Sequence, residues 1–169
     1  MRLKPTSLLF LILIAATSAP ARSSDPSSGL IVPGRIGNAM KFDGVHYLRP
    51  PGLGMLDKGT FAVWIQPQEN PEQIVTLLNT DRWQRSACHF QLFDGLAQFS
   101  VAEAVEIRSH AHPGLEFGKW QHIAASYDST SRAVAIYVNG ALDRKATCER
   151  SVPMDLRDFS IGAWNRGRP

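Results

Sequence analysis

The segment Gly118–Thr147, GKWQHIAASYDSTSRAVAIYVNGALDRKAT, contains two β-type apolar runs on either side of Asn139-Gly140. Asn and Gly both accept the positive φ that a two-residue type I′ turn requires at its central positions. We therefore predict a β-hairpin of residues 133–138 with residues 141–147. A third strand is predicted upstream at 123–127, joined to the hairpin through the polar turn at 128–131.

A straight hairpin would pair Val138 with Ala141, Ile136 with Asp143 and Val134 with Lys145. Because strand side chains alternate, Val134, Ile136 and Val138 share one face, which we predict to be the core face. On a straight second strand Cys148 would lie on the opposite face, beside Tyr137. A bulge near Lys145 would reverse that assignment.

Short strand-like runs separated by turn signals continue along the rest of the chain. Asp94-Gly95 predicts a second tight hairpin, and residues 60–65 alternate so that Phe61, Val63 and Ile65 share a face opposite to Trp64. No segment from Gly34 onward shows sustained helical spacing of apolar residues. The pattern predicts an all-β antiparallel sandwich or barrel, and the jelly roll is the favoured member of that set. The runs outside the opening segment are 39–42, 45–48, 60–65, 73–78, 87–93, 96–102, 105–108 and 159–162.

The first 21 residues have the composition of an export signal. Arg2 and Lys4 precede an apolar run from Leu8 to Ala16, and Ala19-Pro20-Ala21 supplies the small residues of a cleavage site. The run is shorter than the about 20 residues of a membrane-spanning helix. We expect residues 1–21 to be a signal peptide, 22–34 a flexible linker and 35–169 one domain, which would be secreted, periplasmic or at the cell surface.

Removal of this leader changes the charge balance. It leaves 16 basic against 15 acidic residues, a net charge of +1, and no run of Lys or Arg. The mature chain therefore gives no indication of nucleic acid or an anionic membrane as a partner, and no membrane span is expected after cleavage.

Two cysteines, Cys88 and Cys148, are present in a chain that we expect to be exported. Export permits a disulfide between them. The alternative is two separate small buried side chains. The sequence leaves both readings open.

The opening segment also resembles a known family. Its W-x-H-I-A-x-x-Y-D and I-Y-V-N-G motifs are similar to the central signature of LamG-like jelly-roll domains, in the concanavalin A-like lectin/glucanase group. Residues 37–44, 61–67 and 159–164 resemble further family motifs in the expected order. The resemblance implies an antiparallel jelly-roll β-sandwich and a recognition module without catalysis of its own.

Family domains continue past the Ile-Gly strand with a closing strand beside the first one, and that segment is not recognisable here. On this comparison, residues 40–42 would lack one neighbouring strand. We therefore expect the domain to be truncated or completed by another chain or protomer.

Binding residues are predicted on loops. A glycan site needs an exposed aromatic ring with polar neighbours, and Trp83 with Asp81, Arg82 and Arg85 fits that requirement, although simple loop packing of Trp83 is an equal alternative. Relatives in this group often hold calcium through loop carboxylates. The resemblance therefore implies calcium as the one candidate cofactor, with Asp43, Asp81 and Asp128 as candidate ligands.

Catalysis is not expected. Retaining glycosidases need two carboxylates about 5–5.5 Å apart, and no Glu-x-Asp or Glu-x-Glu triplet places such a pair on one strand face. We expect an exported, non-catalytic module that binds carbohydrate. The alternative is a structural adhesion or assembly module that binds a protein partner, and a glycoside hydrolase is the least favoured class.

Overall fold

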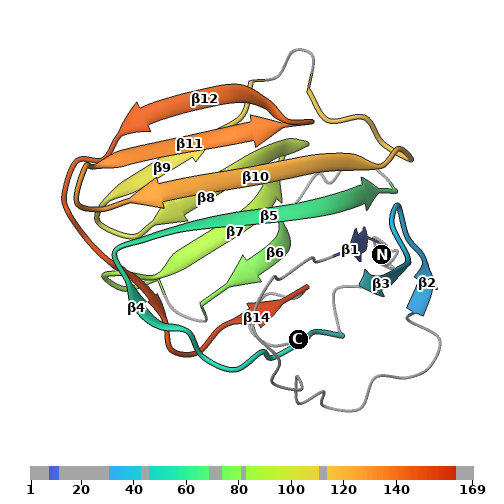
Figure 1. Cartoon of the computed structure of the whole chain (residues 1–169), viewed down its shortest axis with the longest axis horizontal. Helices are drawn as coiled ribbons and strands as arrows, with labels where there is room; N and C mark the ends of the chain where they lie inside the picture. Colours follow the sequence, from blue (N-terminus) through green and yellow to red (C-terminus); the bar gives the residue numbers. More distant parts are fainter. Residues whose placement is uncertain are drawn as a thin grey trace, which may run out of the picture.

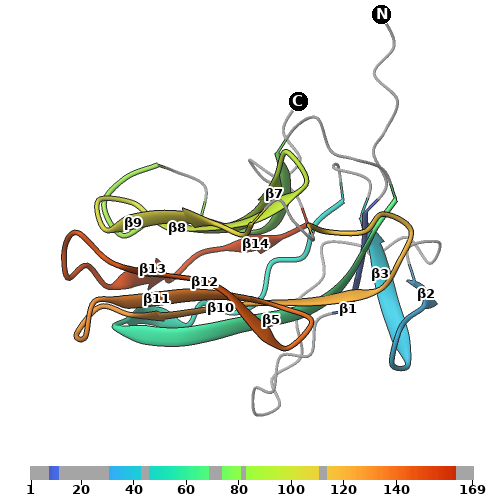
Figure 2. The same ribbon diagram turned by 90° about the horizontal axis from the view of Figure 1, so that it is seen from above.

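The computed structural model describes residues 8–11, 31–42, 46–68, 74–80, 83–110 and 114–162, and every regular element in this part of the chain is a β-strand. The strands form two antiparallel layers (Figures 1 and 2). This confirms the prediction of an all-β antiparallel jelly-roll sandwich.

The larger layer is a seven-stranded sheet in the order β12-β11-β10-β5-β1-β3-β2. Its strands are β1 (Leu8–Leu11), β2 (Ile31–Pro33), β3 (Asn38–Phe42), β5 (Lys58–Pro67), β10 (Gln121–Asp128), β11 (Ala133–Val138) and β12 (Ala141–Thr147).

The smaller layer is a five-stranded sheet in the order β14-β6-β7-β8-β9, and a separate two-stranded ladder joins β4 to β13. These strands are β4 (Gly54–Leu56), β6 (Val75–Asn79), β7 (Cys88–Phe93), β8 (Leu96–Val101), β9 (Val105–Arg108), β13 (Met154–Leu156) and β14 (Ser160–Ile161).

The hydrophobic core lies between the two layers. Phe99 on β8 contacts the rings of Phe61, Phe90 and Tyr127, with centroid distances of 5.9, 6.2 and 6.0 Å. Because β5 and β10 belong to the other layer, this aromatic cluster joins the two sheets. Inward Val63, Ile65, Val134 and Ile136 are buried as predicted, and Val138 is partly buried against them.

The opening hairpin forms at Asn139-Gly140, where φ is 51° and 82°, but its register differs from the prediction. Val138 pairs with Ala141, whereas Ile136 pairs with Arg144 and Val134 with Ala146. The predicted pairs with Asp143 and Lys145 are therefore wrong, because a bulge at Asp143 shifts the strand by one residue. The bulge returns Cys148 to the buried side, as one near Lys145 would have done.

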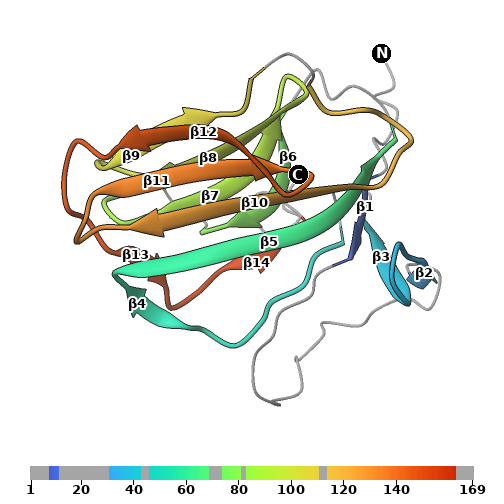
Figure 3. The ribbon, with the colours of Figure 1, turned by 45° about the horizontal axis from the view of Figure 1, so that its top comes forward.

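The N-terminal part of the domain differs most from expectation. The last residues of the predicted linker, 31–33, form β2 and pair with β3. Leu8–Leu11, inside the predicted signal peptide, forms β1 between β3 and β5 (Figure 3). The prediction that residues 40–42 lack a neighbour is wrong for this structure, since β3 is paired on both sides. Of the strand predicted at 45–48, residue 45 lies outside the described residues, and residues 46–48 form one bridge, between Leu48 and Ile161.

Candidate functional site: the outer face of the five-stranded sheet

The face of the five-stranded sheet that points away from the core is polar. In β7 and β8 the residues that alternate with the core residues are amides, a hydroxyl and an imidazole, and the ladder places them side by side: His89 opposite Ser100 and Gln91 opposite Gln98. β6 extends this row, because Asn79 pairs with His89 and Thr76 with Gln91. We call this set the amide row; it comprises Thr76, Asn79, His89, Gln91, Gln98 and Ser100.

The amide row is buried, yet many of its polar atoms have no partner. Thr76 Oγ1, both polar atoms of Asn79, Gln91 Oε1, Gln98 Oε1 and Ser100 Oγ are enclosed without a hydrogen bond. A buried donor or acceptor left unpaired costs about 1–3 kcal/mol, so a natural sheet face does not accumulate such groups without a compensating partner. Their concentration on one face marks a polar layer that is closed to solvent in this structure, and its hydroxyl and amide groups are of the kind that bind sugar hydroxyls.

Trp83 lies over one end of this row. Its ring contacts the ring of His89 edge-on, with a centroid distance of 5.0 Å and an interplanar angle of 61°. Trp83 remains 59% exposed whereas His89 is 2% exposed. An exposed indole beside polar side chains is a suitable arrangement for stacking on a sugar ring.

The loop that holds Trp83 is anchored by its own ends. Thr80 binds β7 twice, since its N–H donates to the Cys88 carbonyl and its hydroxyl accepts from the Cys88 N–H at 2.9 Å. The Ala87 N–H donates to the Gln84 carbonyl, which closes the turn after Trp83. These bonds fix the position at which the indole emerges above β7.

His89 is held as a neutral ring. Its Nε2 lies 3.1 Å from the Thr80 carbonyl, and because a carbonyl only accepts, Nε2 is the protonated nitrogen. Burial lowers the pKa of His89, and the bond to Thr80 opposes that shift only in part. The centre of the site is therefore uncharged near neutral pH.

Charged groups occur only at the edge of this face among the residues that the structure describes. Arg108, across the ladder from Gln98, stacks over the Phe93 ring at 4.2 Å and pairs with Glu106 at 3.1 Å. The mutual pairing of Arg108 and Glu106 leaves an overall neutral surface beside the amide row.

Of the binding residues predicted from the sequence, Trp83 lies beside the amide row, whereas Arg85 pairs with a glutamate. The Arg85 guanidinium binds Glu103 at 3.0 Å, and Arg150 approaches the same carboxylate at 3.6 Å. Asp81 and Arg82 lie outside the described residues.

The amide row was not predicted, although the sequence contains a signal for it. His89 and Gln91 alternate with Cys88, Phe90 and Leu92, and Gln98 and Ser100 alternate with apolar residues in the next strand. Alternation within one strand shows which side is polar, but it does not show that the polar sides of three strands form one buried row.

The predicted calcium ligands do not form a cluster in the described part of the chain. Asp43 and Asp81 lie outside it. Asp128 caps its own turn, because its Oδ1 accepts the N–H groups of Thr130 and Ser131, and these bonds lower the pKa of its carboxyl. Among the described residues no three His, Cys, Asp or Glu side chains converge as metal ligands.

Cys88 and Cys148 are both buried and are separate thiols in this structure. Burial raises the pKa of each thiol, most strongly for Cys88. Tyr127 lies beside Cys148, and its hydroxyl donates to the Val152 carbonyl at 2.6 Å. The structure therefore corresponds to the second alternative, in which Cys88 and Cys148 are two separate small buried side chains.

Solved structures of similar fold are found at low sequence identity. Domain 4 of AbnA, a GH43 extracellular arabinanase from Geobacillus stearothermophilus in complex with arabinotriose, aligns with a TM-score of 0.59 and 19% identity, over 85% of this chain and 71% of that one. Mouse laminin alpha1 chain domains LG4-5 align with a TM-score of 0.56 and 19% identity, over 73% and 33%. The CBM40 of Ruminococcus gnavus IT-sialidase, bound to alpha2,3 sialyllactose, aligns with a TM-score of 0.53 and 14% identity, over 71% of this chain and 82% of that one.

No curated protein matches the chain at a significant level. Within the described residues, no helix is long and apolar enough to span a membrane. Residues 42–169 match the laminin G family model of the concanavalin A-like lectin/glucanases superfamily. Because this match covers most of the chain and agrees with the sandwich described above, the protein belongs to the concanavalin A-like lectin/glucanases superfamily.

Proposed function

We propose that this domain is an exported, non-catalytic carbohydrate-binding module that binds neutral glycan on the outer face of its five-stranded sheet. The observation that supports this most directly is the position of Trp83, exposed and seated on His89 at the end of the amide row. The indole supplies an exposed stacking surface, and the enclosed amides and hydroxyls beside it would supply donors and acceptors for sugar hydroxyls once a ligand opens the row.

The neutral ligand follows from the charges at the site. The described cations near this face are engaged by carboxylates, Arg85 with Glu103 and Arg108 with Glu106. Among the described residues, an acidic sugar would therefore find no unpaired cation there to bind its carboxylate, whereas a neutral chain needs only the amide and hydroxyl groups. Two solved relatives of the fold are complexes with arabinotriose and sialyllactose, which supports a glycan ligand in general.

The same two ion pairs support binding without catalysis. A glycosidase needs one carboxyl free to act as an acid and a second as nucleophile or base. Glu103 and Glu106, the glutamates described near Trp83, are each bound to arginine. We therefore expect binding without release of reducing ends. Release that disappears in Glu103→Gln or Glu106→Gln would contradict this.

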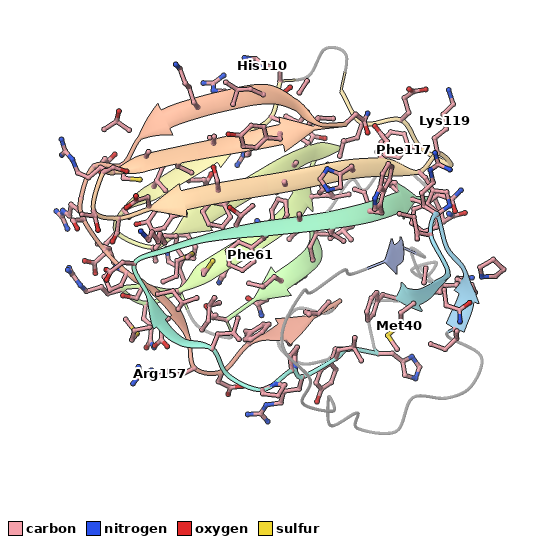
Figure 4. All side chains as sticks on the ribbon, in the orientation of Figure 1. Met40, Phe61, His110, Phe117, Lys119 and Arg157 are labelled. Atoms are coloured by element: carbon pink, nitrogen blue, oxygen red, sulfur yellow. The ribbon has the colours of Figure 1, made fainter. Side chains whose placement is uncertain are left out.

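The test is a titration of soluble neutral and acidic polysaccharides by calorimetry, with Trp83→Ala against the unaltered protein. Loss of the stacking surface should weaken binding about tenfold or more, since stacking on one aromatic ring contributes roughly 1–3 kcal/mol. Phe117→Ala is the matched control, because Phe117 is also an exposed aromatic but lies near the start of β10 in the other sheet (Figure 4). Equal affinity of Trp83→Ala and Phe117→Ala, or a preference for acidic chains, would refute the proposed site.

A calcium chelator added to the same titration tests the cofactor prediction. If Asp43, Asp81 and Asp128 contribute to a calcium site that supports binding, the affinity should fall in chelator and return with added calcium. Unchanged affinity would remove calcium from the proposed function.

A further inference from the structure

The far end of β7 carries a second exposed group on the same face of the sheet as Trp83. Phe93, the last residue of β7, alternates with the core residues in the same way as His89 and Gln91, so its ring points outward. The Arg108 guanidinium of β9 lies over that ring, 4.2 Å from its centroid, and the Arg108 side chain is 41% exposed. This face, the upper side of the β7–β9 layer in Figure 2, therefore has an exposed indole at the start of β7 and an exposed guanidinium at its end.

This second group offers donors and acceptors that match neighbouring hydroxyls on one sugar ring. Arg108 Nη2 donates to Glu106 Oε1 at 3.1 Å, and among the described residues this is the one hydrogen bond of the guanidinium. A guanidinium carries five N–H groups in one plane, so further donors are available to a ligand. Glu106 supplies acceptor oxygens beside them and balances the charge. Because the Phe93 ring packs against the guanidinium and restricts its movement, these groups form an ordered polar surface without net charge.

The distance between the two ends of β7 sets the length of a ligand that can contact both. His89, which the Trp83 ring contacts, and Phe93 lie on one strand, so they are separated by about 13 Å, the length of about three linked sugar rings. Between them the amide row is closed to solvent, with Gln91 5% exposed, so an approaching ligand meets Trp83 and Arg108 first. A single sugar ring reaches one of these two side chains, whereas a chain of rings reaches both.

We propose that the glycan site has two subsites, the Trp83 indole and the Arg108–Glu106 pair on Phe93, and that it takes an internal stretch of a linear neutral glycan of at least about three sugar units. A site for a single terminal sugar would enclose one ring in a pocket, whereas these two exposed groups lie at opposite ends of one strand. Contact at the first subsite makes contact at the second intramolecular, so affinity rises once a chain spans both. This inference rests on the proposed function and names the class of glycan that the site takes.

The test is a calorimetric titration of the complete chain with soluble cello-, xylo- and arabino-oligosaccharides of one to six sugar units. The readout is the ratio of the affinities for the four-unit and the two-unit sugar of each series. The variants are Trp83→Ala and Arg108→Ala, each of which replaces an exposed side chain. Arg49→Ala is the matched control for the second variant. Arg49 is also an exposed arginine paired with a carboxylate, that of Asp158 at 2.8 Å, but it precedes β4 and lies outside β7, β8 and β9.

In the unaltered protein and in Arg49→Ala, we expect the four-unit sugar of the recognised series to bind about tenfold more tightly than the two-unit sugar, with little further gain at six units. Arg108→Ala should bring this ratio close to one, and Trp83→Ala should weaken the binding of every length.

Two results would overturn the two-subsite proposal and leave the proposed function intact. They are Trp83-dependent binding with equal affinity for two and four units, and the same length dependence in Arg108→Ala as in Arg49→Ala. Absence of binding to all three series would overturn the proposed function together with this inference, so the two failures are distinguishable.

Discussion

At the scale of single residues, the packing of Gly162 against Phe42 shows how close contact in the core restricts which residue a position can hold. Gly162 follows β14 with a φ of 92°, and a Cβ placed there would lie 2.1 Å from Phe42 Cδ1. Phe42 is fully buried in the core, so its ring has little room to move. The absence of a side chain at 162 therefore allows the last strand to cross this ring.

Gly162→Ala is expected to reduce the free energy of unfolding by at least about 2 kcal/mol, because a steric clash in the core adds to an unfavourable φ. Gly37→Ala is the matched control. Its φ is also positive, at 63°, but a Cβ there would have nothing within 4 Å, so only the backbone contribution of about 1 kcal/mol is expected. Chemical denaturation of both variants measures the difference, and equal losses would contradict the packing argument.

His89 gives a prediction of pH dependence. Its folded-state pKa lies below the ordinary 6.5, so the unfolded chain binds the proton more readily as the pH falls through that value. The stability contribution of neutral His89 is therefore complete above about pH 6.5 and decreases towards lower pH. Thermal unfolding of His89→Gln should show a smaller loss of Tm between pH 7.5 and 5.5 than the unaltered protein. The same loss in both would show that His89 does not titrate in this way.

At the scale of strands, the alternation of apolar and polar residues correctly identified the side of each strand that faces the core. It did not indicate the structure of the opposite side. The inward positions of β5 and β11 follow directly from period-two spacing, as Phe61, Val63 and Ile65 show. The register of β12 could not be obtained in this way, because a bulge depends on how Asp143 contacts the other sheet. Its Oδ1 accepts the N–H of His110, 33 residues earlier in the chain, at 2.8 Å.

The amide row yields a prediction about the balance between stability and binding. Gln98→Leu replaces an unpaired buried Oε1 with an apolar group, so we expect the Tm to stay equal or to rise while glycan affinity falls. Gln121→Leu is the control in the other sheet. Gln121 is also buried, but its Nε2 donates to the Glu116 carbonyl at 2.7 Å, and its loss should cost about 1 kcal/mol. A large destabilisation by Gln98→Leu would show that its amide has a structural role.

At the scale of the whole molecule, the fold class could be predicted from the sequence, whereas the role of Trp83 as a binding residue stays a prediction. Trp83 could be proposed from the sequence because an aromatic residue in a polar loop is visible locally. Thr76, Asn79 and Gln91 were missed because they come from separate strands and become neighbours only after the sheet has formed. The position of Leu8–Leu11 was missed for a different reason: its composition matches an export signal, and composition does not show which strands would pair with it.

The contact between Tyr127 and Val152 holds β10 against the segment that leads into β13. Tyr127→Phe removes the donor to a carbonyl in a buried segment, so the free energy of unfolding should fall by about 1–3 kcal/mol. Tyr137→Phe is the matched control, because Tyr137 lies on the outer face of β11 and is only partly buried. Denaturant titration of the two variants compares them, and an equal effect would mean that the Tyr127 hydroxyl contributes nothing specific.

The bulge in β12 also affects how the protein behaves at high concentration. β12 ends the seven-stranded sheet, and an unprotected edge of this kind pairs readily with the edge of another molecule. The extra residue at Asp143 interrupts the regular spacing of its outward N–H and C=O groups, and exposed Arg144 and Lys145 follow at once. A second molecule would have to match an irregular, positively charged edge, so the shift that corrected the hairpin register also protects the sheet against aggregation.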